Sequence, residues 1–383
     1  NEDAQHAACR IAAAFKLEPV DTEEAKPAKG KSGQQKAAWK IVPCDPGQVS
    51  IFFPCEKETS KLRFHLHAPF ASTVARDSVR DCPDNHRLRD GLAKLVAENL
   101  SDIRDRGLLT MDFLAVLPIP DDTLSPFYAP IRSAIVTAFK TQELTPAKGG
   151  GHKKASELYR GPADISGVID DADLAFLAAA HPTRRWASNA PQRGQRADKF
   201  HDSLEIDKWE WEQLAEVIGT SEKAQQIEVW IAKKNDNWLM HFYGLLHHVN
   251  EQEYSRWPKT YYYQVRRLKL VRAESLAIAD SKPVHLPSKF AHKSNTVCHV
   301  SAEDVFFPQG QSHSTTDVLF VKPEVYAKNG SEPQKTAARE FLKSIGVREY
   351  DERVEVERRL KTYPGGKKID ENHFTDIALF VTY

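Results

Sequence analysis

The stretch FHLHAPFASTVARDSVRDCPDNHRLRDGLAKLVAENL, residues 64–100, decides the fold of the first part of the chain. Its first residues alternate between an apolar and a polar face, formed by Phe64, Leu66 and Ala68 and by His65 and His67. Such a period of two is typical of a half-buried β-strand. We therefore predict a strand that gives way to a loop of small residues.

After that loop the apolar residues recur at helical spacing, at Leu88, Leu92, Leu95, Val96, Leu100 and Ile103. The spacing predicts an amphipathic helix over 84–107. Asp84 or Asn85 is the expected N-cap, and Gly107 the expected stop.

The loop between strand and helix carries Arg76, and two interpretations of it stay open. In the first, Asp77 and Asp81 screen Arg76 and Arg80 in ion pairs at the start of the helix. In the second, Arg76 is aimed at a phosphate held by another domain, because a guanidinium is always charged and donates to two oxygens at once.

The composition indicates an ordinary soluble protein, with 383 residues, 41% of them hydrophobic and 28% charged. Basic and acidic residues number 53 each, so no net charge attracts nucleic acid to the whole molecule. Five scattered cysteines favour neither a disulfide framework nor a cysteine zinc site, and indicate a cytoplasmic protein. No apolar run is long enough to span a membrane. The first residue, Asn1, and the apolar last residues suggest part of a longer protein.

The predicted fold class is α+β, in two parts. Residues 1–145 form the first domain, with strands expected in 47–55 and 62–70 and a second helix over 126–142. The glycine-rich segment 147–156 is expected to be a flexible linker.

Residues 160–383 are expected to form an α+β region with two related subdomains, 160–270 and 271–383. One internal similarity supports this division. KFHDSLEIDKW (199–209) aligns with EFLKSIGVREY (340–350), and each predicts a helix end that turns into an extended segment. A common junction used twice and a duplicated subdomain both explain the similarity.

Several catalytic motifs are absent or incomplete. KGKSG (29–33) resembles part of a P-loop, but Ala25 stands where the first glycine belongs. GGGHKK (149–154) offers backbone N–H groups and lysines to an anion, although a linker is the simpler interpretation. No histidine or carboxylate spacing matches a metal site, and we predict none. No G-x-S-x-G motif is present.

Residues 255–272 give one indication of nucleic-acid binding, because cations there alternate with aromatic rings that stack on bases. The candidate contacts are Arg256, Lys259, Tyr262, Arg266, Arg267 and Lys269. A strand with one basic, solvated face explains the same pattern. The two interpretations differ in the salt dependence of binding.

The order of FHLHAPF, a loop ending in Ala75-Arg76-Asp77, and a long helix resembles the middle, or transducer, domain of the GHKL ATPases. This group includes DNA gyrase B and the heat-shock chaperones of ninety kilodaltons, in which a Ser-Arg-Glu loop stands at that place. The similarity is closer to large bacterial proteins with a sacsin-type, chaperone-like ATPase domain, which also contain paired F-L-x-x-L-G-V junctions like those near 200 and 341.

This resemblance implies a βαβ transducer domain of the ribosomal-S-five type, followed by mixed α/β subdomains. It implies that Arg76 contacts the γ-phosphate of ATP, and that ATP and magnesium are bound by a preceding domain, since the Asn-box helix and the Asp-x-Gly-x-Gly loop are not in this chain. The expected partners are that ATPase domain, a second copy, and a protein or nucleic-acid client. The expected role is coupling of ATP hydrolysis to conformational change, chaperone-like or in bacterial anti-phage defence. A nucleic-acid-binding or scaffold module without catalysis is the alternative.

Overall fold

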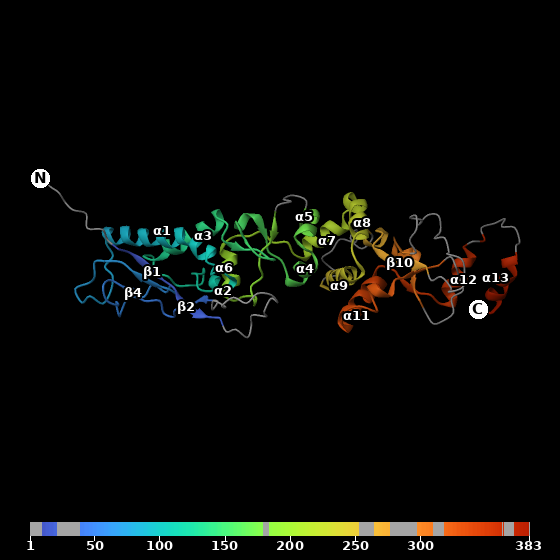
Figure 1. Ribbon diagram of the computed structural model, residues 1–383. Helices are drawn as coiled ribbons and strands as arrows, with labels where there is room; N and C mark the ends of the chain where they lie inside the picture. The colour runs from blue at the N-terminus through green and yellow to red at the C-terminus, as the bar shows by residue number, and fades with distance from the viewer. Residues whose placement is uncertain are drawn as a thin grey trace, which may run out of the picture. The chain divides into compact units, whose positions relative to one another are not determined.

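The computed structural model describes residues 10–20, 39–178, 184–252, 264–275, 297–308, 318–361, 363 and 371–382. Helices alternate with several small mixed sheets, so the predicted α+β class is confirmed (Figure 1). The chain divides into two compact units, Asn1–Glu210 (unit 1) and Trp211–Tyr383 (unit 2). This division falls inside the range 160–270 that we expected to be one subdomain, and the predicted ranges stay predictions.

Unit 1 begins with a small sheet of order β1-β5-β4, formed by Ala12–Ala14, His65–His67 and Val49–Ser50. β5 pairs antiparallel with β1 and parallel with β4. As predicted, Phe64, Leu66 and Ala68 are buried. They share one continuous core with the apolar residues of α1, Pro83–Asp105. β5 is shorter than predicted, because the chain leaves the sheet after His67.

α1 and α3 (Ala129–Thr141) pack against each other in unit 1 (Figure 1). The predicted stop of α1 at Gly107 is confirmed by its left-handed φ of 73°. The predicted N-cap is wrong, because Cys82 holds that position without a side-chain cap. Asn85 instead lies buried within the first turn, where it binds the preceding loop.

The rest of unit 1 includes the hairpin of β2 (Lys16–Pro19) and β3 (Trp39–Val42), and the short helix α2 (Met111–Leu114). It continues as β6 (Thr145–Pro146), β7 (His152–Lys153), a 3-10 turn at Ala155–Glu157, β8 (Leu158–Tyr159), α4 (Ala163–Val168), α5 (Asp171–Ala178), β9 (Arg185–Trp186) and α6 (Arg196–Ser203).

The glycine-rich segment is a tight turn and not the expected linker. Gly149, Gly150 and Gly151 all have positive φ and close the β6–β7 hairpin. Three consecutive left-handed residues are tolerated there because glycine lacks a Cβ. Lys153 pairs with Glu143 at 3.0 Å.

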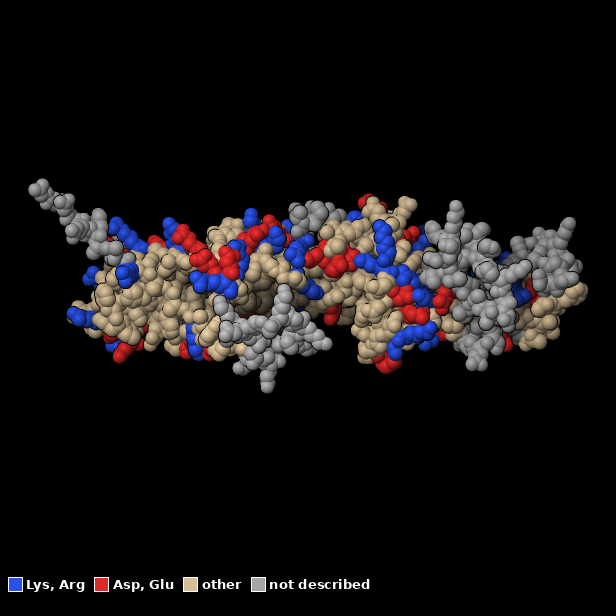
Figure 2. Space-filling model, viewed as in Figure 1, with Lys and Arg blue, Asp and Glu red and all other residues tan. Residues whose placement is uncertain are grey.

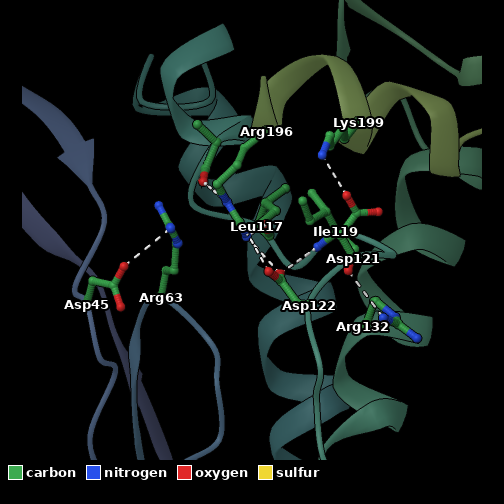
Figure 3. A network of polar contacts seen from close by, with 10 residues as sticks. Asp45, Arg63, Leu117, Ile119, Asp121, Asp122, Arg132, Arg196 and Lys199 are labelled. Carbon is green, nitrogen blue, oxygen red and sulfur yellow. Dashed lines mark hydrogen bonds and ion pairs between the residues drawn. The ribbon is translucent and has the colours of Figure 1, made fainter. Parts of the chain in front are cut away.

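A half-buried ion pair fixes α6 to the first half of unit 1 (Figure 3). The Arg196 guanidinium donates to both carboxylate oxygens of Asp122, at 2.6 and 2.7 Å, and also to the carbonyls of Ala115 and Leu117. Fork-to-fork geometry of this kind fixes orientation as well as distance. α6 is therefore held rigidly along its N-terminal side.

Unit 2 begins with the helices α7 (Trp211–Gly219), α8 (Ala224–Ala232), preceded by a 3-10 turn at Ser221–Lys223, and α9 (Asp236–Gln252). A mixed sheet of order β11-β10-β13-β12-β14 follows, formed by Val297–Val300, Val271–Ser275, Leu319–Val321, Val305–Phe307 and Arg348–Glu349. 3-10 turns lie at Ala302–Asp304 and Pro323–Val325, α11 (Glu332–Ser344) packs on α9, and α12 (Glu352–Leu360) and α13 (Glu371–Thr382) complete the unit.

The same strand order occurs in both units, over 145–209 and 271–350. In unit 2, β10 pairs antiparallel with β11 and β13, and β12 pairs parallel with β13 and β14. In unit 1, β6 pairs antiparallel with β7, and Ala147, which continues β6, forms an antiparallel bridge with Ala187, which follows β9. β8 pairs parallel with β9, and Arg160 after β8 forms a parallel bridge with Lys208. A 3-10 turn precedes β8 and β12 alike.

The predicted junctions lie at corresponding places in these two segments. Phe200 and Phe341 are fully buried, and in each case the serine three residues later donates its hydroxyl back to the phenylalanine carbonyl at 2.6 Å. The following turn has positive φ at the aligned positions, 54° at Glu205 and 114° at Gly346. The observed pairings favour the duplicated subdomain over a common junction used twice.

Candidate functional site

The loop at residues 71–80, the Arg76 loop, is a closed hairpin and not an open connection. Ser72 and Val79 form an antiparallel bridge. The amide of Thr73 donates to the Ser78 carbonyl at 3.1 Å, and that of Arg76 to the Thr73 carbonyl at 3.0 Å. These bonds leave residues 74–76 at the tip.

Asn85 closes the base of the loop from the first turn of α1. Its Nδ2 donates to the carbonyls of Ala71 and Arg80, at 2.8 and 2.6 Å, and its Oδ1 accepts from the Ala71 amide at 2.8 Å. Asn85 is fully buried, so these bonds are shielded from competition with water. The strand, the loop and the helix are thereby joined at one residue.

Glu58 supports the loop from the other side. Its Oε2 accepts from the Val79 amide at 2.9 Å, and its Oε1 accepts from the Tyr128 hydroxyl at 3.0 Å. Burial and the adjacent Glu58 carboxylate raise the pKa of Tyr128, so its hydroxyl stays a donor. The Arg76 loop is therefore clamped from two elements beyond its own sequence.

Arg76 itself is exposed and has a left-handed φ of 57°. A non-glycine residue in this region costs roughly 1 kcal/mol and is uncommon. The first of the two interpretations, screening of Arg76 by Asp77 and Asp81, is wrong. Asp77 pairs with Lys57 at 2.7 Å, and Asp81 pairs with His86 at 2.5 Å. Within the described residues no acidic side chain pairs with the Arg76 guanidinium.

This arrangement can present one cation to a partner. The neighbouring tip residue Val74 is also fully exposed, so none of the described residues of unit 1 covers the tip. A guanidinium without an acidic partner keeps its full capacity to donate to two oxygens of a phosphate.

The predicted nucleic-acid residues are only partly placed. Arg256, Lys259 and Tyr262 lie outside the described residues. Arg266, Arg267 and Lys269 are exposed in unit 2, before β10. Residues 264–267 are helical, so the strand expected to carry them begins later, at Val271.

The Arg266 guanidinium has a structural partner, since it donates to the Ser344 carbonyl at 3.1 Å. At Lys269 it is the backbone amide, not the ammonium, that donates to the Glu228 carboxylate, at 3.0 Å. Nucleic-acid binding by this segment stays a prediction. On the viewed face, basic and acidic side chains are interspersed (Figure 2).

In the part of the chain that the structure describes, no three metal-ligating side chains gather in one place. The ring of His65 accepts from the Gln48 amide at 2.9 Å, and His248 packs on Trp211. No helix among the described residues is long and apolar enough to cross a bilayer.

Sequence patterns did not indicate the loop supports Glu58, Asn85 and Tyr128, since a clamp across 70 residues leaves no local signal. They also did not indicate a second polar cluster in unit 1, around Arg160 and His201.

Comparison of the chain with protein-family models, with curated proteins and with solved structures finds no match.

Proposed function

We propose that the Arg76 loop delivers a guanidinium to the γ-phosphate of ATP, which a separate ATPase domain binds together with magnesium. The chain would then act as the transducer of a GHKL-type ATPase. Closure onto ATP would engage Arg76, and the rest of the chain would pass the resulting movement to a partner.

One observation supports this proposal most: an exposed arginine without an acidic partner, in a strained conformation, at the tip of a loop clamped by buried side chains. A surface arginine with no role needs neither the strain nor the clamp. Strain of this kind persists only where surrounding structure imposes it, and it concentrates at functional sites. The clamp also lowers the entropic cost of presenting the guanidinium in one place.

The test is steady-state ATP hydrolysis by the polypeptide that joins this chain to its ATPase domain. Arg76→Ala should lower turnover by up to about 10³-fold, the low end of what an inserted arginine contributes in other NTPases. Arg76→Lys should restore only part of the rate, because an ammonium lacks the planar fork.

Arg87→Ala is the matched control, since Arg87 is an exposed arginine on α1 whose contact with Asp84 is long, at 3.9 Å. It should hydrolyse ATP like the wild type. Equal rates for the wild type and Arg76→Ala would contradict the proposal, and so would an equal loss in the Arg87 control.

A further inference from the structure

β1 forms a free edge of the first sheet in unit 1. In the order β1-β5-β4 it has a neighbour on one side only, within the residues that the structure describes. The Leu66 amide in the middle of β5 donates at 2.9 Å to the Gln48 carbonyl, just before β4. β5 therefore uses its two other residues to pair with β1, and Ala13, which stands opposite Leu66, turns its N–H and C=O away from the sheet.

Ile11 and Phe15 extend this free edge, because every second residue of a strand turns its backbone groups to the same side. Neither residue forms a backbone hydrogen bond within the described part of the chain. Such a row of unpaired groups is a template for a further strand, and native proteins commonly protect it with a charge or a proline. The three alanines of β1 provide neither protection.

A largely apolar cavity of about 350 Å³ lies between β1 and α1, which run alongside each other in unit 1 (Figure 1). Ala13 lines it between two larger residues, Ile11 and Phe15, and α1 contributes Leu95 and Ile103. Opposed residues of paired strands point their side chains to the same face of a sheet. A residue paired with Ala13 would therefore place its side chain in this cavity.

The polar rim of this cavity lies at the Phe15 end of the edge. A Cβ at Gly91 would lie 3.1 Å from the Ile11 side chain, so the early part of α1 lies at the other end. Asp102 and Arg106, further along α1, line the rim, and neither has an ion pair within the described residues. One acid and one base together fit a neutral amide, which donates to the carboxylate and accepts from the guanidinium.

We propose that β1 binds an extended segment of a partner protein as a fourth, antiparallel strand. A large apolar side chain of that segment stands opposite Ala13 and fills the cavity, and an amide side chain two residues before it binds Asp102 and Arg106. In this mode the backbone hydrogen bonds give affinity and the side-chain pocket gives specificity. The antiparallel direction is chosen because such pairs are the more stable per residue. The site is independent of Arg76 and of ATP hydrolysis.

The test measures binding of the peptide acetyl-Lys-Gln-Thr-Leu-Thr-Val-Lys-amide to the full chain, by fluorescence anisotropy of a labelled copy. With its leucine opposite Ala13, the antiparallel peptide directs the leucine N–H at β1 and the N–H of the preceding threonine away from it. Methylation of the leucine nitrogen should weaken binding about tenfold or more, whereas methylation of that threonine nitrogen should change it by less than about twofold. Saturation with the unmodified peptide should also slow amide exchange across 10–16.

Two variants of the chain test the same contact. Ala13→Pro removes the outward N–H, which an edge strand tolerates because this N–H pairs with nothing in the sheet. Asn99→Phe fills the cavity from the exposed surface of α1, where the Asn99 side chain donates only to its own helix, at the Leu95 carbonyl. Each variant should weaken binding about tenfold or more. Ala14→Thr is the matched control and should bind like the wild type, because Ala14 is exposed and does not line the cavity.

The proposal is overturned if the unmodified peptide does not bind, or if the N-methylleucine peptide binds at least as well as the N-methylthreonine peptide. It is also overturned if Ala13→Pro and Asn99→Phe both bind like the Ala14→Thr control. A dimer in sedimentation that Ala13→Pro dissociates, without any peptide binding, would place a second copy at the edge instead. Both methylated peptides meet the same wild-type chain, so unfolding of a variant would not explain a difference between them.

Discussion

His201→Leu should stabilise unit 1, and the gain should grow as the pH falls. The substitution removes a buried imidazole whose Nε2 is unpaired and introduces leucine, the residue found at the equivalent place in unit 2, Leu342. Relief of one unpaired buried polar group is worth about 1–3 kcal/mol in the free energy of unfolding. We expect a gain in that range at pH 7.

The pH dependence follows from the pKa of His201. Burial and the Arg160 guanidinium lower this pKa to about 4, although the charges of Asp198 and Asp202 act to raise it. A free histidine titrates near 6.5. As the pH falls from 6.5 toward 4, His201 becomes protonated in the unfolded state but stays neutral in the folded state. The unfolded state is therefore stabilised relative to the folded state, and the wild type loses stability. Between pH 7 and pH 5 this loss amounts to about 2 kcal/mol, which the leucine variant escapes.

Hydrogen exchange in urea, read on peptides from 196–204, reports the stability of unit 1 separately from that of unit 2. Leu342→His is the reverse control and should destabilise unit 2 by about 2–4 kcal/mol. The reasoning is refuted if His201→Leu destabilises unit 1 at every pH, or if its effect is the same at pH 5 and pH 7.

Three further substitutions test other contacts of unit 1. Asn85→Ala removes three hydrogen bonds and should cost about 1–3 kcal/mol in urea unfolding while accelerating amide exchange across 71–80; unchanged exchange there would show that Asn85 does not hold the loop. Arg196→Met leaves the half-buried Asp122 carboxylate without its partner and should cost about 1–3 kcal/mol, whereas adding Asp122→Leu should recover most of that loss; a double variant no more stable than the single one would contradict this expectation. Gly161→Ala places a Cβ 2.6 Å from the Trp186 ring and from the Trp209 carbonyl, and should lower stability by about 1–3 kcal/mol; a variant that melts like the wild type would show that the backbone relaxes there.

The sequence was most informative where local periodicity and tertiary packing agree. The alternation at 64–68 predicted the buried face of β5, and the apolar spacing predicted α1 to within a few residues. Both patterns reflect burial in one core. The end of α1 was also predictable, because a glycine with positive φ is a local requirement.

The sequence-based predictions failed where a residue binds or pairs with an element that is distant in the sequence. Asn85 has the residue type of an N-cap, but its amide binds the loop at Ala71 and Arg80 instead. The glycine run at 149–151 was expected to be a linker, since nothing local shows that β6 and β7 pair around it. Asp77 was assigned to Arg76 by proximity in sequence, whereas the fold brings Lys57 to it.

The sequence analysis did not identify the cluster around Arg160 and His201, although one signal for His201 was present. Alignment of 199–209 with 340–350 already places His201 opposite Leu342, a polar residue against an apolar one at a buried position. The alignment could not supply Arg160, which reaches α6 only through the pairing of β8 with the strand segment after that helix.

The most direct measurement of the central claim is the rate of ATP hydrolysis and the affinity for ATP, compared between the wild type and Arg76→Ala in a polypeptide that joins this chain to the proposed ATPase domain. If Arg76 acts on the γ-phosphate in the closed state, turnover falls steeply while the dissociation constant for ATP stays nearly unchanged. If turnover and affinity are both unaffected, the Arg76 loop does not deliver a guanidinium to ATP, and the transducer function is wrong.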